Sequence, residues 1–316
     1  MQAGSIGATT ESLWDLAMDY GKLASIRGVD FALPEDDPSN AECVVREPNA
    51  VPKVLVGVPA WGEPRWLGRV YPRGSKPGEF LRHYASQFPT IELNSTFYGV
   101  PAPSTVDKWR AQTPASFRFC AKIVRDVSHE PDLSAAIAAL GRYLDVMTPL
   151  GERLGAFFLQ WPPEVGPAEG ALVAAVLDAW PRELRLVVEF RHPDWFTGGR
   201  LVAAARRMLE RRQMGTVVCD VAGRRDACHS SLTADVMMLR LVGNDLHATD
   251  MVRAVDWSKR IGTWLDLGLD TAYVMAHQPD NVRAPEYANI LSDNLRHHTG
   301  LNVQKWRPVA SQMKLF

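Results

Sequence analysis

Eight short apolar runs divide residues 54–277 into a repeating pattern, and most of them end on a polar or charged residue. The runs are VLVGVPAW (54–61), TIELNSTFY (90–98), FRFCAKI (117–123), GAFFLQW (155–161), RLVVEF (185–190), GTVVCD (215–220), DVMMLRLV (235–242) and TAYVMAH (271–277). Segments with the apolar period of a helix separate most of them. A strand and helix unit that repeats in this way predicts an α/β fold, the TIM-type (β/α)8 barrel.

We expect one domain with two extensions. The repeating pattern and its last helix fill residues 54–300, close to the roughly 250 residues of one such barrel. Residues 1–53 are expected to hold an N-terminal amphipathic helix, over 11–26, and an extended, proline-rich linker. Residues 301–316 form a short C-terminal tail. The connection 221–234 lacks a helical period, so we expect a loop or a single turn there.

Composition excludes several classes of protein. The chain has 35 Lys and Arg against 36 Asp and Glu, so no global field favours nucleic acid or a membrane surface. The 4 cysteines form no CxxC pair, and a buried free thiol is the ordinary interpretation. No apolar run approaches the roughly 20 residues that cross a bilayer, and the first residues carry no secretory signal. We expect a cytoplasmic protein without a membrane anchor.

Polar side chains end most of the runs. Those that we expect at the barrel mouth are Glu92, Asn94, Lys122, Gln160, Glu189, Arg191, His192, Asp220, Arg240 and His277. Because the carboxyl ends of barrel strands open on one face, these side chains are predicted to share one substrate pocket. The alternative for each charge is a structural ion pair, for example between Glu92 and Lys122.

The loop after the first run mixes aromatic and basic residues. It reads WGEPRWLGRVYPRG (61–74) and begins with Trp61. Aromatic faces beside guanidinium groups suit bases, sugars or phosphates. The alternative is a hydrophobic lid that closes the top of the barrel.

Five ordered motifs resemble those of the YecE-like family, known as domain of unknown function 72. They are VGVPAWGEPRW, TIELNSTFYGVP, FRFCAKIVRDVSHE, FFLQWPP and VVEFRHPDWF, and the resemblance covers most of residues 54–280. It implies a TIM-type barrel with a shared pocket at the strand ends, but no established reaction. The positions that match the recurring polar residues of the family are Trp61, Glu92, Asn94, Tyr98, Lys122, His129, Gln160, Glu189, Arg191, His192 and Asp220.

The end of the barrel departs from the commoner family pattern. Many members have an Arg-x-His-Gly run after the seventh strand and a Phe-Asn-Asn run after the eighth, whereas this chain has RLVGND (240–245) and MAHQPDN (275–281). His277 stands where the family has its asparagine pair. The resemblance therefore implies no roles for residues on this side of the pocket.

Two common barrel chemistries fit the sequence poorly. Retaining glycosidases resemble one another in placing two carboxylates after strands four and seven, where this chain has Gln160 and Arg240. A Schiff-base aldolase needs a lysine of depressed pKa. Lys122 is the candidate, but a carboxylate on the next strand is expected to keep it protonated.

The strand ends favour an anionic ligand over a metal. A divalent cation would be held by Glu92, Glu189, Asp220 and His277, as in sugar-isomerase and AP-endonuclease barrels. Three cations, Lys122, Arg191 and Arg240, share the same mouth and would repel a metal ion. No cofactor is favoured, and a divalent metal stays the alternative. Backbone N–H groups of Gly243 and Asn244, after the seventh strand, are placed where many barrels bind a phosphate.

The favoured hypothesis is an enzyme, a hydrolase, lyase or isomerase, that acts on a phosphorylated, nucleotide-like or nucleic-acid ligand, with a role in DNA repair. In this hypothesis Glu189 or Asp220 is the general base, His277 or His129 the proton shuttle, and Lys122, Arg191 and Arg240 the anion clamp. The alternative is a barrel that binds a ligand or a partner without chemistry.

The last residues of the chain, Gln312 to Phe316, suggest a partner. Their order, Gln, apolar, polar, Leu, Phe, resembles the short peptide by which bacterial replication and repair proteins dock on the sliding clamp. Gln312 would bond at the edge of the groove, and Leu315 and Phe316 would fill an apolar pocket. The alternative is a tail that packs on its own barrel.

Overall fold

The structure, a computed structural model, describes residue 21 and residues 23–44 and 50–309. Most of the predicted N-terminal helix, over 11–26, lies outside the described residues. So do Gln312, Leu315 and Phe316, and their docking on a clamp stays a prediction.

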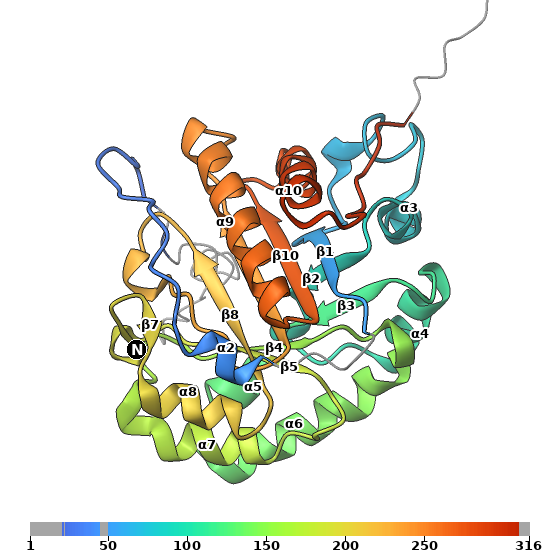
Figure 1. Ribbon diagram of the computed structural model, residues 1–316. Helices are drawn as coiled ribbons and strands as arrows, with labels where there is room; N and C mark the ends of the chain where they lie inside the picture. The colour runs from blue at the N-terminus through green and yellow to red at the C-terminus, as the bar shows by residue number, and fades with distance from the viewer. Residues whose placement is uncertain (1–20, 22, 45–49, 310–316) are drawn as a thin grey trace, which may run out of the picture.

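Eight parallel strands of the described chain form one sheet, at the positions of the eight predicted runs. They are β1 (Lys53–Val58), β2 (Thr90–Leu93), β3 (Arg118–Ala121), β4 (Phe157–Gln160), β5 (Leu186–Glu189), β8 (Gly215–Asp220), β9 (Val236–Val242) and β10 (Thr271–His277), in the order β3-β2-β1-β10-β9-β8-β5-β4. Bridges between Phe119 and Leu154 and between Lys122 and Phe158 join β3 to β4. The sheet therefore closes into the predicted TIM-type barrel (Figure 1).

Helices surround the strands, as Figure 1 shows. They are α2 (Asn40–Cys43), α3 (Phe80–Gln87), α4 (Pro103–Gln112), α5 (Arg125–Ser128), α6 (Leu133–Met147), α7 (Gly170–Asp178), α8 (Ala203–Glu210), α9 (Ala248–Leu267) and α10 (Ala284–Thr299). Short 3-10 turns are η1 (Pro64–Trp66), η2 (Pro77–Glu79), η3 (Ser95–Phe97), η4 (Thr148–Arg153), η5 (Pro167–Glu169), η6 (Pro193–Trp195) and η7 (Arg225–Ala227). A small hairpin, β6 (Phe196–Thr197) with β7 (Arg200–Leu201), follows β5.

Helix α9 is longer than its apolar period predicts. The pattern indicates a helix over 258–268, whereas the helix begins at Ala248. Its first half buries Asp250, Arg253 and Trp257 on one face. Because two of these buried residues are charged, hydrophobic period alone misses this half of the helix.

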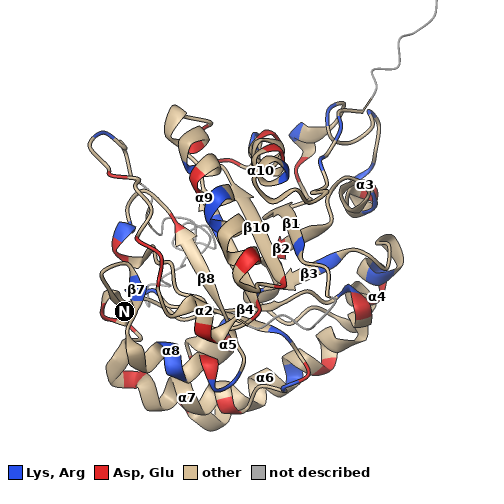
Figure 2. Cartoon of the chain, in the orientation of Figure 1, with Lys and Arg blue, Asp and Glu red and all other residues tan. Residues whose placement is uncertain are grey.

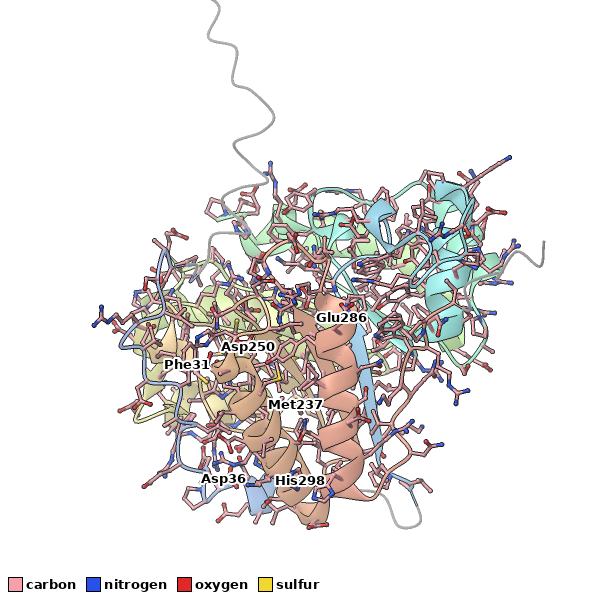
Figure 3. All side chains as sticks on the ribbon, turned by 90° about the horizontal axis from the view of Figure 1, so that it is seen from above. Phe31, Asp36, Met237, Asp250, Glu286 and His298 are labelled. Carbon is pink, nitrogen blue, oxygen red and sulfur yellow. The ribbon has the colours of Figure 1, made fainter. Side chains whose placement is uncertain are left out.

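In the connection between β8 and β9, all of which the structure describes, the only helical element is the short turn η7, as predicted. The N-terminal segment covers this side of the barrel. Residues 30–44, here named the strap, bond to the connection. Asn40 Nδ2 donates to the Ser230 carbonyl at 2.8 Å, and the Leu232 amide donates to Asn40 Oδ1 at 2.7 Å. Figure 3 shows Phe31 and Asp36 on the same side of α9. The strap thus takes the place of a sixth barrel helix.

Candidate functional site

The interior of the barrel consists of an apolar layer below a polar one. The apolar layer includes Cys120, Phe158, Val187, Met238 and Met275. Side chains two positions further along a strand point to the same side. Those positions hold Lys122, Gln160, Glu189, Arg240 and His277, and Glu92 of β2 completes the layer. The predicted convergence of these strand ends on one mouth is therefore present.

Arg240 joins the two carboxylates of this layer. Its Nε and Nη2 donate to the two oxygens of Glu92 at 3.0 Å each, and its Nη1 donates to Glu189 Oε2 at 3.0 Å. Asn94 Nδ2 donates to Glu92 Oε1 at 2.9 Å, and His277 Nε2 lies 2.9 Å from Glu92 Oε2. Both carboxylates are almost completely buried. Such burial is tolerated only with this degree of hydrogen bonding.

A second chain of contacts leads from Glu189 to Lys122. Arg191 Nε donates to Glu189 Oε1 at 2.5 Å, and Gln160 Nε2 donates to the same oxygen at 3.0 Å. Gln160 Oε1 accepts a hydrogen bond from Lys122 Nζ at 2.9 Å. These contacts unite eight predicted residues into what we name the mouth network: Glu92, Asn94, Lys122, Gln160, Glu189, Arg191, Arg240 and His277.

The arginines keep both carboxylates ionised. Burial alone would raise the pKa of Glu92, but Arg240 and His277 hold it well below the usual range. Burial acts in the same way on Glu189, and Arg191 and Arg240 lower its pKa to about 2. A carboxylate of so low a pKa is a weak proton acceptor near neutral pH. The predicted role of Glu189 as general base is therefore poorly supported by its surroundings.

Lys122 differs from the expectation for this position. The predicted ion pair with Glu92 is not formed, because Arg240 occupies that carboxylate; within the described chain Lys122 has no carboxylate within 4.0 Å. Its Nζ lies 3.9 Å from the centre of the Phe97 ring. Burial, Arg240 and Arg191 lower the pKa of the amine to about 7. In contrast to the expectation from the sequence, no carboxylate is in direct contact with the amine to keep it protonated.

Phe97 is not among the predicted site residues, because the sequence pattern continues the second run as one strand to residue 98. Strand β2 ends at Leu93, and the chain turns through η3, so the alternation of strand side chains stops there. The turn brings the Phe97 ring over the Lys122 amine. No sequence signal marks that change of direction.

Four further predicted residues follow the strand ends and are at least partly exposed: Trp61, Tyr98, His129 and His192. The His129 and Tyr98 rings lie 5.5 and 5.4 Å from that of Phe97. Burial and the nearby Lys122 lower the pKa of His129. Trp61 packs edge-on against Trp109, with ring centres 5.8 Å apart. Tyr98 and His129 therefore flank the Phe97 ring that lies over the Lys122 amine, whereas a ligand-binding role for Trp61 and His192 stays a prediction.

Asp220 lies apart from the mouth network. Its carboxylate accepts hydrogen bonds from Arg253 Nη1 at 3.0 Å, from Trp257 Nε1 at 2.6 Å and from Arg225. Cys219, one position earlier, is the residue that reaches toward Arg240, with Sγ 4.0 Å from Nη1. Since neighbours in a strand face opposite sides, Asp220 points outward to α9. Its assignment as a general base at the mouth is corrected to a structural contact.

The predicted phosphate site after β9 is also occupied by internal contacts. The Gly243 amide donates to the His277 carbonyl at 2.9 Å. The Asn244 amide donates to Asp250 Oδ2 at 2.7 Å, and its side chain bonds to Asp250 Oδ1 at 3.2 Å. Both backbone donors are therefore satisfied by the protein, and we withdraw Asn244 as a ligand-binding residue.

The donor set does not suit the alternative of a divalent metal. Arg240 lies between Glu92 and Glu189, and Asp220 points to the other side of the sheet. Among the described residues, no group of three His, Cys, Asp or Glu could hold a metal ion. A cation here would have to displace a guanidinium that bonds to both carboxylates.

Two findings concern the outside of the molecule. Acidic and basic residues are interspersed over α6, α7 and α8 in Figure 2, in keeping with the balanced composition. Within the described ranges, no helix has the length and hydrophobicity of a membrane span.

Comparison with known proteins gives relatives but no activity. The chain is 31% identical over 261 residues to the UPF0759 protein YecE of Escherichia coli K12, which covers 77% of this chain and 93% of YecE. It is 24% identical to the UPF0759 protein YunF of Bacillus subtilis over 156 residues, which covers 46% of this chain and 52% of YunF.

A solved structure and a family model agree with this relationship. A DUF72 family protein from Enterococcus faecalis V583 superposes with a TM-score of 0.62 at 17% identity, over 80% of this chain and 100% of that protein, and so shares the fold. The model of the family described as protein of unknown function DUF72 matches residues 55–312. With most of its length matched, this chain belongs to the DUF72 family.

Proposed function

We propose that the barrel is an enzyme that binds a small anionic ligand, phosphorylated or nucleotide-like, at its mouth. The observation that carries this proposal is the buried Lys122 amine, held within a charged network without a carboxylate partner of its own. A core that served stability alone would place apolar side chains in this layer, and the active sites of TIM barrels lie at these strand ends.

The charge balance of the mouth supports an anionic ligand. Glu92 and Glu189 are matched by Arg191 and Arg240, so these four side chains sum to zero. The remaining titratable side chains of the network, Lys122 and His277, can add only positive charge. A ligand that carries negative charge would compensate a protonated Lys122, whereas a cationic ligand would meet a net positive charge.

A thermal-shift experiment tests the binding step. Purified protein is heated with a panel of sugar phosphates, nucleotides and short oligonucleotides, beside the variants Lys122→Met and Lys108→Met. Lys108 is exposed on α4 and serves as the matched control. We expect a compound that raises the Tm of the wild type and of Lys108→Met but has little effect on Lys122→Met. Equal stabilisation of all three proteins would contradict binding at Lys122.

The low pKa of Glu189 favours a second candidate, a barrel that binds its ligand without chemistry. In that case neither buried carboxylate needs to accept a proton. Incubating each stabilising compound with the protein separates the two candidates. If the barrel is an enzyme, the compound is converted, and the Lys122→Met variant does not convert it. If the barrel is a binding module, the compound is recovered unchanged.

A further inference from the structure

We propose that the Lys122 amine attacks the carbonyl carbon of an aldehyde or ketone ligand and forms an imine with it. This inference deepens the proposed function and rests on it, because it assigns a substrate class and a covalent step to the same mouth. It reverses the expectation from the sequence, in which a carboxylate on the next strand keeps this lysine charged.

The position of Lys122 is fixed from both ends of the residue. Its carbonyl oxygen accepts hydrogen bonds from Thr96 Oγ1 at 2.6 Å and from Tyr143 Oη at 3.1 Å. At the other end, Nζ donates to Gln160 Oε1 and rests against the Phe97 ring. A nucleophile held in one place loses little freedom when it reacts, which is the main requirement for an efficient attack.

The surroundings of the amine favour its neutral form. Glu92 and Glu189 are each bound by guanidinium groups, so neither is free to pair with an ammonium group. An ammonium ion at this position would be a buried charge without a carboxylate in direct contact. Burial and the two arginines accordingly lower the pKa of Lys122 to about 7, which leaves about half of the amines neutral at pH 7, against about one in 3,000 for an ordinary lysine.

The step balances without an oxidant or a reductant. The nitrogen lone pair forms a bond to the carbonyl carbon, the C=O π pair moves to oxygen, and that oxygen takes up a proton as the nitrogen releases one. A second proton, taken from solvent, lets the resulting hydroxyl leave as water, and the nitrogen lone pair forms the C=N bond of a protonated imine. Burial and Lys122 lower the pKa of His129, which favours its neutral form, so this imidazole, with its ring 5.5 Å from that of Phe97, can pass the proton from nitrogen to oxygen.

The charge of the product indicates the substrate class. A protonated imine carries a positive charge next to Arg191 and Arg240, and the two carboxylates are already matched. A carboxylate or phosphate group on the ligand would compensate that charge. The class is therefore a small carbonyl compound with an acidic group, either a 2-oxo acid or an aldehyde or ketone phosphate.

Reductive trapping tests the proposal. The full chain is incubated at pH 7 with sodium cyanoborohydride and, in separate arms, pyruvate, dihydroxyacetone phosphate or glyceraldehyde 3-phosphate, and modified lysines are mapped by peptide mass spectrometry. We expect at least one compound to modify Lys122 about tenfold or more faster than the exposed Lys76 and Lys108. The arm that reacts identifies the acidic group. The wild-type rate should rise with pH to a midpoint near 7, as the amine loses its proton.

Arg191→Gln provides a second variant that keeps the lysine. Removing this cation should raise the pKa of Lys122 and move the midpoint of trapping to higher pH. The inference is overturned if no carbonyl compound modifies Lys122, or if Lys122 reacts no faster than Lys76. Such a result leaves the proposed function standing when a phosphorylated compound still stabilises the wild type and not Lys122→Met. If no compound stabilises the protein and no adduct forms, both proposals fail.

Discussion

Arg240 on β9 binds the carboxylate of Glu92 on β2 through two parallel hydrogen bonds of 3.0 Å. The two strands are not neighbours, because β1 and β10 lie between them in the sheet. The pair thus spans the interior of the barrel, and the third contact of Arg240, with Glu189, extends this connection to β5. One guanidinium group therefore helps to keep both carboxylates at the mouth ionised, together with Arg191 at Glu189 and His277 at Glu92.

Replacing Arg240 with Met should destabilise the protein strongly. Both carboxylates would be left buried without their shared partner, and breaking a buried pair in this way costs about 3–5 kcal/mol of unfolding free energy. Urea unfolding measures the loss. Arg283→Met is the matched control, because Arg283 pairs with Asp245 at the surface, with side chains 49% and 69% exposed. That change should cost less than about 1 kcal/mol. Similar losses of unfolding free energy in the two variants would show that Arg240 contributes no more to stability than a surface arginine.

Acid should destabilise the protein through Glu189. Its pKa falls from 4.5 to about 2 on folding, so above pH 4.5 the ionised form contributes its full stability. As pH drops below 4.5 the unfolded chain takes up the proton first, and this contribution is lost down to about pH 2. Melting temperatures between pH 2 and 6 should therefore fall less steeply in Glu189→Gln than in the wild type. Glu183→Gln, at an exposed position, should follow the wild-type curve.

Lys122 also makes stability rise with pH, but in a higher pH window than Glu189. Its pKa in the folded protein is about 7, below the ordinary 10.5, so between these values the unfolded chain binds more protons. Stability then rises with pH in this window, by up to about 1.4 kcal/mol per pH unit. The difference in unfolding free energy between wild type and Lys122→Met should change in favour of the wild type from pH 7 to pH 10. A difference that is constant over this range would mean that Lys122 titrates normally.

Asp220→Asn separates stability from chemistry. The change weakens the contacts with Arg253 and Trp257, and Arg253 is completely buried. We expect a loss of about 1–3 kcal/mol in urea unfolding and no change in the trapping of Lys122. Asp266→Asn, exposed on the same helix, is the control for the first measurement. If the folded Asp220→Asn protein no longer formed the trapped adduct, Asp220 would have to act at the barrel mouth after all.

Sequence pattern was sufficient for the barrel and for most of the site. Each strand contributes an apolar run, and fixed alternation places Glu92, Gln160, Glu189 and Arg240 inside the barrel without further information. The same rule, applied to the sixth run, would have placed Cys219 inside and Asp220 outside. The error at Asp220 came from counting a polar residue at a strand end as a mouth residue, whichever way it faced.

The state of Lys122 could not be predicted, because it depends on contacts between strands distant in sequence. The sequence supplies three acids and three bases at the strand ends, but not that only Glu92 and Glu189 lie inside the barrel, nor which acid pairs with which base. Once Arg240 and Arg191 take both carboxylates, the lysine is left with an amide and an aromatic ring. Competition among neighbours in three dimensions, rather than residue type, determines its pKa.

The strap should stabilise the connection between β8 and β9, on the side of the barrel that has no sixth helix. Asn40 is completely buried and pairs with the backbone of Ser230 and Leu232. Asn40→Ala would leave both backbone groups buried without a partner, at a cost of about 1–3 kcal/mol for each. We expect a lower midpoint in urea and faster hydrogen exchange at the Leu232 amide, whereas Glu42→Ala, exposed on the same short helix, should change neither. Unchanged exchange at Leu232 would mean that the connection keeps its conformation without the strap, and that the strap only lies on a surface that is already stable.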